Sequence, residues 1–284
     1  MPTDQIVQYC FSGITVGSIY AIVAIGFNII YNTTGVINFA QGEFVVLGAM
    51  TSISLAALIT ALIGALVELL FIRPAKQPTV LRLIIITIGV SILLRETALH
   101  VWDEKVHALP FFTGTEVSSV TLLGAHVSPQ VLWVLGACAL IVAGLSLFFK
   151  FTLPGRAMRA CAANRTAAQL CGIKVRWMVT ASFMLSAGVG ALAGCVISPV
   201  TQTQYDMGAP LAIKGFTVAI LGGLGNSIAA VAAGLLLGLL EAFSISLFPL
   251  AYQDVVAIVI LLAVLCFRPS GLFGRRDAHA FGEF

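Results

Sequence analysis

The chain has 284 residues, of which 59% are hydrophobic and only 10% are charged. Ordinary soluble domains are about 45–50% apolar and about 25% charged, so this composition excludes both a water-soluble globular protein and a disordered one. The net charge of +3 is too small to indicate a nucleic-acid partner. We therefore expect a protein whose surroundings are the lipid bilayer.

Apolar runs approaching or exceeding the about 20 residues that a helix needs to cross a bilayer follow one another along the chain. They comprise residues 11–31, 44–67, 83–99, 130–149 and 177–205, a short or broken helix before residue 222, and spans at about 227–247 and 254–267. The sequence predicts an all-α, polytopic transmembrane helical bundle of about seven or eight membrane segments, including broken or re-entrant helices. We expect residues 1–284 to form a single transmembrane domain.

Basic residues cluster in three segments, 73–82, 150–176 and the tail 268–284. The positive-inside rule places these segments in the cytoplasm and leaves 101–129 and 198–214 facing outward. The first apolar run has no basic region before it, so we expect it to remain as a membrane helix rather than a cleaved signal peptide. An outward N-terminus is favoured, although residues 42–72 could cross once, cross twice, or dip in and return.

Enzyme motifs are absent from the sequence. There is no HExxH or GxSxG, and no lysine is followed by Ser or Thr as in a P-loop. The six cysteines form no CxxC pair and the four histidines fall in loops or at span ends, so no metal site and no cofactor are predicted. If ATP drives this protein, another chain must bind it.

Polar residues interrupt the apolar pattern directly after the first span. Asn38, Gln41 and Glu43 lie between two apolar runs with almost no loop to solvate them, and Gly35 and Gly42 flank them. A carboxyl group at membrane depth is costly and is normally held by partners or by a water-filled path. The alternative interpretation is a tight interfacial turn whose polar groups cap two helix ends.

A second interruption, Leu221–Asn226, has a similar composition. Transporters often place substrate at paired broken helices, so we predict a translocation path lined by both breaks. Its expected residues are Asn38, Gln41, Glu43, Gly222, Gly223, Gly225 and Asn226. Glu241 is read as an interfacial carboxylate, with a place on the path as the alternative.

Pairs of glycines four residues apart occur in three spans. Gly13/Gly17, Gly190/Gly194 and Gly234/Gly238 are small-residue faces that allow close helix packing. They fit a tight bundle and a dimer equally well.

The segment 150–176 is the longest hydrophilic feature of the cytoplasmic face. Residues Arg156–Leu170 are rich in helix-forming Ala, Met and Arg, and Gly172 provides a stop. The sequence predicts one short basic helix outside the membrane. It serves either as a positive-inside anchor or as a docking helix for a cytosolic partner.

Five stretches of the sequence form a pattern when they are taken in order. They are Gly17-Ser18-Ile19-Tyr20-Ala21, Gly35-Val36-Ile37-Asn38-Phe39-Ala40-Gln41-Gly42-Glu43, Gly155-Arg156-Ala157-Met158-Arg159-Ala160 with Gly172-Ile173, Phe216-Thr217-Val218-Ala219-Ile220-Leu221-Gly222-Gly223-Leu224-Gly225 and Arg268-Pro269-Ser270-Gly271-Leu272-Phe273-Gly274. This pattern resembles the permease subunits of branched-chain amino acid ABC importers. The resemblance covers nearly the whole chain. It implies a multi-pass protein of the bacterial inner membrane that imports branched-chain or other hydrophobic amino acids.

The resemblance also implies partners. These are a second homologous permease, two cytosolic ATP-binding subunits that hydrolyse ATP, and a periplasmic substrate-binding protein. ATPase coupling would fall to Gly155, Arg156, Arg159, Ala160 and Gly172. The same machinery could carry urea, short amides or aromatic acids, and an ion-coupled secondary transporter using Glu43 or Glu241 is the alternative from another class.

The sequence departs from the family pattern in two places. The stretch between Gly42 and Glu68 is about one short span smaller than expected, and the loop reads Ala163-Asn164-Arg165 where relatives commonly carry an acid. The second departure predicts a less ionic contact with the ATPase.

Overall fold

The computed structural model describes residues 3–51, 53–75, 79–107, 109–114, 118–122, 125–246, 249, 252–268 and 271–272. Its helices are α1 (Thr3–Thr34), α2 (Gln41–Met50), α3 (Ile53–Val67), α4 (Val80–Trp102), α5 (Pro129–Phe151), α6 (Leu153–Ala163), α7 (Arg165–Leu170), α8 (Val175–Thr201), α9 (Gly208–Gly222), α10 (Ser227–Ser244) and α11 (Gln253–Phe267). A π-helix, Glu68–Ile72, extends α3, and two short strands, β1 (Val120–Leu122) and β2 (Ala125–Val127), pair antiparallel.

The predicted all-α membrane bundle is confirmed. Five helical stretches in the described part of the chain are long and apolar enough to cross a membrane: Gln5–Thr34, Leu55–Ile72, Pro129–Phe151, Val175–Thr201 and Ser227–Ser244. Helix α4 has 23 residues, which at about 1.5 Å per residue also matches a hydrocarbon core of about 30 Å. Shorter apolar helices α9 and α11 complete the bundle.

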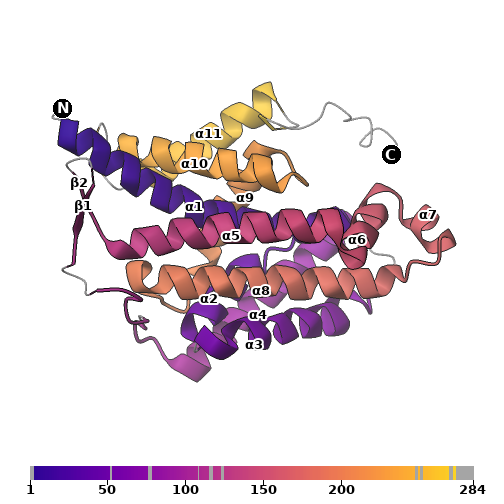
Figure 1. Ribbon diagram of the computed structural model, residues 1–284. Helices are drawn as coiled ribbons and strands as arrows, with labels where there is room; N and C mark the ends of the chain where they lie inside the picture. The colour runs from indigo at the N-terminus through magenta and orange to yellow at the C-terminus, as the bar shows by residue number, and fades with distance from the viewer. Residues whose placement is uncertain are drawn as a thin grey trace.

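Helix α1 runs through the middle of the bundle (Figure 1). Its most apolar part is 89% buried inside the protein, whereas the corresponding part of α5 is only 22% buried and leaves its side chains to the lipid. Residues 21–25 have no exposed surface at all. The core of the protein therefore surrounds α1, with α5, α8, α9 and α10 packed around it.

Glycines bring α1 and α10 into backbone contact. A Cβ on Gly17 would overlap with Gly234, and a Cβ on Gly238 would overlap with Gly13. The small-residue pairs of these two helices thus face each other within one chain, which decides between the bundle and dimer interpretations for them. Close approach of this kind supplies van der Waals packing where lipid offers no hydrophobic driving force.

Replacing Gly238 by alanine should therefore destabilise the protein. The added methyl group has no space against Gly13 and Gly17, and overpacking of this kind costs about 1–3 kcal/mol. The melting temperature of the detergent-purified protein measures the effect. Gly136→Ala is the matched control, because a Cβ at Gly136 meets nothing within 4 Å, and an equal drop in both variants would contradict the packing argument.

The segment after α1 turns back into the bundle. Gly35 has a φ of +67°, a conformation that favours glycine, and residues 35–40 are not helical. Helix α2 then begins with the Gln41 side chain between Gly26, in the last third of α1, and Ser186, near the middle of α8. The run 44–67 is consequently two helices, because α2 ends at Met50 and Thr51 is extended.

The two ends of the bundle agree with the predicted sidedness. The N-terminus of α1 lies at the same end as β1 and β2, and α6 and α7 lie at the opposite end (Figure 1). If 150–176 is cytoplasmic, as its charge predicts, the N-terminus faces outward. Helix α2 is half-length and its end near Met50 packs beside Trp102, the last residue of α4.

Candidate functional site

Glu43 occupies the interior of the bundle at the start of α2. Its side chain is 2% exposed, and its Oε1 accepts a hydrogen bond of 2.9 Å from Oγ of Ser91. Ser91 is the middle residue of α4, so this contact lies near half-depth of the bundle. Glu43 Oε2 has no hydrogen-bond partner among the described residues.

The first turns of α2 and α9 meet beside this carboxyl group. A Cβ on Gly42 would overlap with the Gly208 carbonyl oxygen, and a Cβ on Gly208 would lie 2.6 Å from Glu43 Oε2. Both positions are glycine, because a side chain on either would separate the helices. The Glu43 carboxyl group therefore lies where the first turns of two helices come together, and Ser91 is its hydrogen-bond donor in the described part of the chain.

Gln41 and Asn38 hold the re-entrant segment in place. Gln41 Nε2 donates to the Ser186 carbonyl oxygen at 3.3 Å, and Ser186 Oγ lies 2.6 Å from Gln41 Oε1. Asn38 Oδ1 accepts from the Ala40 N–H at 3.2 Å, which closes a tight turn before α2. Of the three polar residues predicted here, Glu43 is thus the one that contacts α4 and α9.

The second predicted break is a tight turn between α9 and α10. Gly223 and Gly225 both have a φ of +93°. The Gly225 N–H donates to Asn28 Oδ1 at 2.9 Å, and Asn32 Nδ2 donates to the Gly225 carbonyl oxygen at 2.9 Å. Two asparagines one turn apart on α1 therefore fix this turn.

The other two predicted residues of this turn, Gly222 and Asn226, also hold α9 and α10 in position. Asn226 Oδ1 accepts from the Ala229 N–H at 3.1 Å and so begins α10, while a Cβ on Gly222 would lie 2.7 Å from Ala230. Among the described contacts, no hydrogen bond or ring contact joins Gly222, Gly223, Gly225 or Asn226 to Asn38, Gln41 or Glu43. The structure does not bring the two breaks into one cluster.

A buried ion pair connects α9 to α10. Lys214 Nζ lies 3.2 Å from Glu241 Oε1, and Tyr20 OH donates to Glu241 Oε2 at 2.9 Å. The Lys214 ammonium also lies over the Tyr20 ring, 5.2 Å from its centroid. Glu241 is 1% exposed, so it is buried and paired rather than interfacial. Sequence reasoning missed this pairing, since Lys214 was assigned to an outward loop.

The segment 150–176 forms two helices rather than the single helix predicted over Arg156–Leu170. Asn164 is extended, with a φ of −160°, and its Oδ1 accepts from the Ala167 N–H at 3.0 Å. This asparagine ends α6 and caps α7, and a side chain that caps a new helix competes with continuation of the old one. Gly172, with a φ of +81°, ends α7 as predicted.

Helix α6 presents one face to the protein and another to solvent. Met158 and Cys161 are buried, and a Cβ on Gly155 would overlap with the Phe148 carbonyl oxygen. Arg156 and Arg159 are exposed. The predicted coupling residues therefore differ in burial. Gly155 is buried and Ala160 is partly buried, whereas Arg156, Arg159 and Gly172 are exposed.

Arg165 connects the segment 150–176 to the C-terminal end of α1. Its Nη2 donates to the Thr33 carbonyl oxygen at 3.2 Å and also to that of Thr34. Carbonyl groups of the last helical turn lack intrahelical partners and attract cations. The basic residue at this departure from the family pattern thus caps α1.

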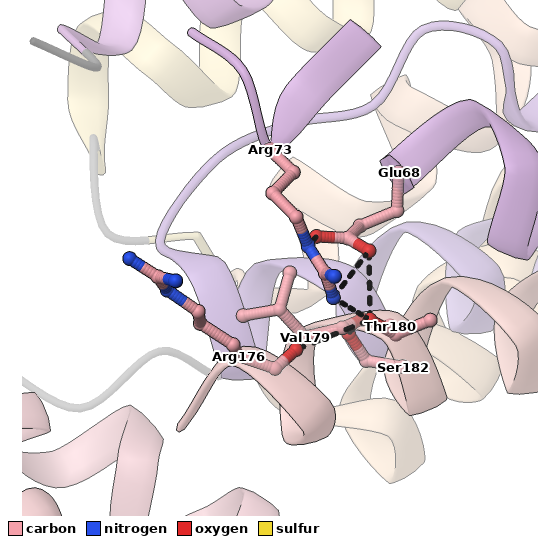
Figure 2. Close-up of polar contacts among 6 residues, drawn as sticks. All are labelled: Glu68, Arg73, Arg176, Val179, Thr180 and Ser182. Atoms are coloured by element: carbon pink, nitrogen blue, oxygen red, sulfur yellow. Dashed lines mark hydrogen bonds and ion pairs between the residues drawn. The ribbon is translucent and has the colours of Figure 1, made fainter. Parts of the chain in front are cut away.

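The C-terminal extension of α3 is joined to the first turns of α8 by the cluster in Figure 2, which is formed by Glu68, Arg73 and Thr180. Arg73 Nη2 lies 3.4 Å from Glu68 Oε2 and donates to Thr180 Oγ1 at 3.0 Å. Thr180 Oγ1 in turn donates to Glu68 Oε2 at 2.7 Å. The π-helical turn Glu68–Ile72 places Arg73 here, since the Arg73 N–H bonds to the Glu68 carbonyl oxygen at 2.7 Å.

Thr180→Val should destabilise the protein while keeping the side-chain shape. The hydroxyl group both accepts from Arg73 and donates to the buried Glu68, and the loss of a hydrogen bond to a charged group costs about 1.5–3 kcal/mol. Thermal unfolding in detergent measures the loss. Thr97→Val is the control, because Thr97 is exposed and bonds only within α4 in the contacts described; an unchanged melting temperature for Thr180→Val would contradict the cluster's role.

These features together define a class of protein. A polytopic bundle of apolar helices, with a half-length helix starting inside it, is the architecture of a membrane transporter. Among the described residues, no group of three or more His, Cys, Asp or Glu side chains could hold a metal ion.

Comparison with known proteins places the chain more narrowly. The family model described as branched-chain amino acid transport system / permease component matches residues 9–265. The permease protein BraD of a high-affinity branched-chain amino acid transport system of Pseudomonas aeruginosa is 33% identical, covering 96% of this chain and 97% of BraD. LivH of Escherichia coli is 31% identical, with 96% of each chain covered. A probable LivH of Methanocaldococcus jannaschii is 26% identical over 90% of this chain and 89% of its own.

The chain belongs to this permease family. It is a permease subunit of an ABC importer of this class and a multi-pass protein of the inner membrane. No solved structure matches it.

Proposed function

We propose that this subunit moves branched-chain or other hydrophobic amino acids across the membrane, with ATP hydrolysed on separate subunits. The names of the relatives, which are branched-chain amino acid permeases, support this substrate class. Residues 1–284 act as a single permease domain in this proposal. Its working partners are a second homologous permease, two cytosolic ATP-binding subunits and a periplasmic substrate-binding protein.

The observation that carries the proposal is the pair of helices α6 and α7 outside the membrane. Met158, Cys161 and Ala168 are buried on the side of these helices that packs against the rest of the protein, while Arg159 is exposed. No hydrogen bond or ion pair joins the Arg159 side chain to the rest of the described protein. A rigid base with an exposed basic side chain suits docking of an ATPase better than simple anchoring to lipid.

Within the membrane, the proposed path runs past Glu43. Asn38 and Gln41 fix the re-entrant segment that positions this carboxyl group. The turn made by Gly222, Gly223, Gly225 and Asn226 stands at the cytoplasmic end of α9, where its bonds to α1 keep α9 in register.

A detergent pull-down of the tagged chain from native membranes, followed by mass spectrometry, tests the proposal. Recovery of a P-loop ATPase and a second permease, together with ATP-dependent uptake of L-leucine in proteoliposomes supplied with the binding protein, is the expected result. Recovery of the chain alone, active without ATP, would instead favour an ion-coupled carrier. Uptake of urea, short amides or aromatic acids in place of L-leucine would keep the machinery and change the substrate.

A further inference from the structure

A cavity of about 310 Å³ opens between α4 and α9, next to Glu43. Its apolar wall includes Ile88, Ile92 and Ile213, each of which is between 43% and 53% exposed. Ser91 and Arg95 supply its polar side chains. The volume falls at the lower end of the about 300–1,000 Å³ typical of small-molecule sites, which suits a ligand of a few heavy atoms.

One charged side chain, Arg95, lines the polar side of this α4–α9 cavity, and an acidic one, Glu43, lies behind that side. Ser91 and Arg95 are four residues apart on α4 and so share one face, with about 5–6 Å between their Cβ atoms. Behind Ser91 lies Glu43, whose Oε1 accepts the Ser91 hydroxyl. The other Glu43 carboxyl oxygen is buried and has no hydrogen-bond partner in the described part of the chain, so Ser91 is the residue that connects this carboxyl group to the cavity.

Arg95 provides the positive charge. Its guanidinium group lies 3.5 Å from Glu96 through Nη2, in a pair whose two side chains are 35% and 50% exposed. An exposed pair of this kind contributes little, so a ligand can replace it at small cost. The planar guanidinium fork matches a carboxylate and binds it through two parallel hydrogen bonds.

We propose that the α4–α9 cavity binds an α-amino acid with an aliphatic side chain as its zwitterion. Arg95 binds the carboxylate, Ser91 Oγ accepts from the ammonium group with the Glu43 carboxyl group behind it as counter-charge, and Ile88, Ile92 and Ile213 contact the side chain. An α-amino acid carries both charged groups on one carbon, so side chains one helical turn apart reach both. This inference rests on the proposed function and assigns its substrate site.

A neutral ligand such as urea has no charged group for Arg95 or Glu43, and a monovalent acid or amine has a charged group for one of them. The charge pair therefore selects zwitterions, and the isoleucine wall selects aliphatic side chains. These two requirements can be tested separately with analogues of leucine that lack one charged group.

The test measures binding of radiolabelled L-leucine to the full-length chain, with the subunits that co-purify, in nanodiscs without any soluble binding protein. Unlabelled 4-methylpentanoate, which lacks the ammonium group, and 3-methylbutylamine, which lacks the carboxylate, are the competitors. We expect each to compete at least about tenfold more weakly than L-leucine, the loss of about one hydrogen bond to a charged group.

Variants assign the charges to residues. Arg95→Gln should weaken L-leucine binding about tenfold and leave competition by 3-methylbutylamine unchanged, because that amine has no carboxylate to lose. Glu43→Gln should weaken the binding of L-leucine and leave competition by 4-methylpentanoate unchanged, because that acid has no ammonium group. Glu96→Gln is the matched control: it removes the observed partner of Arg95 but does not line the cavity, so it should bind like the unmodified protein.

Equal L-leucine affinity in Arg95→Gln and the unmodified protein, or equal competition by all three ligands, would overturn the site. Absence of L-leucine binding to the unmodified protein would overturn it as well. In each case, ATP-driven uptake of L-leucine in the same preparation would leave the proposed function standing. If Arg95→Gln does not assemble, Ile213→Trp carries the test, since this side chain is 53% exposed and a tryptophan there should fill the cavity and block L-leucine.

Discussion

Lys214→Met is expected to destabilise the protein more than any other single substitution considered. It leaves Glu241, which is 1% exposed, without the ammonium group 3.2 Å away, and removing one partner of a buried ion pair costs about 3–5 kcal/mol. The Tyr20 hydroxyl still donates to Glu241, but one neutral donor does not replace a counter-charge. The yield of folded protein and its melting temperature in detergent should both fall.

A double variant separates the ion pair from the packing around it. Lys214→Met combined with Glu241→Leu removes both charges and keeps comparable volume, so it should regain most of the lost stability. Lys105→Met is the control, because Lys105 and Asp103 are 80% and 74% exposed and lie 3.9 Å apart, and it should leave the melting temperature unchanged. A double variant no more stable than Lys214→Met would contradict the electrostatic explanation.

Arg159→Glu is expected to abolish ATP-driven uptake while the protein still inserts and assembles. Arg159 is exposed on α6, so reversing its charge leaves the fold intact, whereas a like charge placed against a complementary partner opposes docking. Uptake by proteoliposomes and ATPase activity of the purified complex measure the effect. We expect either that ATP hydrolysis continues without transport or that the ATPase dissociates from the complex.

Arg176→Glu provides the matched control for Arg159→Glu. It makes the same charge change in the same segment 150–176 and so tests whether altered membrane orientation explains the result. The Arg176 guanidinium points away from the cluster of Glu68, Arg73 and Thr180 (Figure 2), and no docking role is assigned to it. Normal uptake by Arg159→Glu, or equal loss in both variants, would remove Arg159 from the docking surface.

Local signals in the sequence were sufficient for most of the bundle. Asn226 and the glycines before it predicted the start of α10 at Ser227, and Gly172 predicted the end of α7, because capping and left-handed turns depend on a few neighbouring residues. The same local reasoning failed at Asn164, where a capping asparagine inside a helix-forming run divides the run in two.

Long-range pairings could not be predicted from the sequence. Gln41 and Ser186 meet across 145 residues, and Lys214 finds Glu241 from the next helix; charge and spacing alone do not say which polar group in a span meets which. Asn28 and Asn32 did carry a signal, because two asparagines one turn apart in an apolar span need partners. Ser91 and Arg95 were read as part of a simple span, although four-residue spacing already placed them on one face.

The position of α1 has a consequence for the order in which the protein is made. It is made before the other helices described here, yet its most apolar part is 89% buried by helices that follow it. Asn28 and Asn32 find their partner at Gly225, after nearly 200 further residues. During synthesis α1 therefore remains in the bilayer or beside the insertion machinery before Asn28 and Asn32 can bind Gly225. A chain truncated before α10 should be left with this helix as a target for membrane quality control.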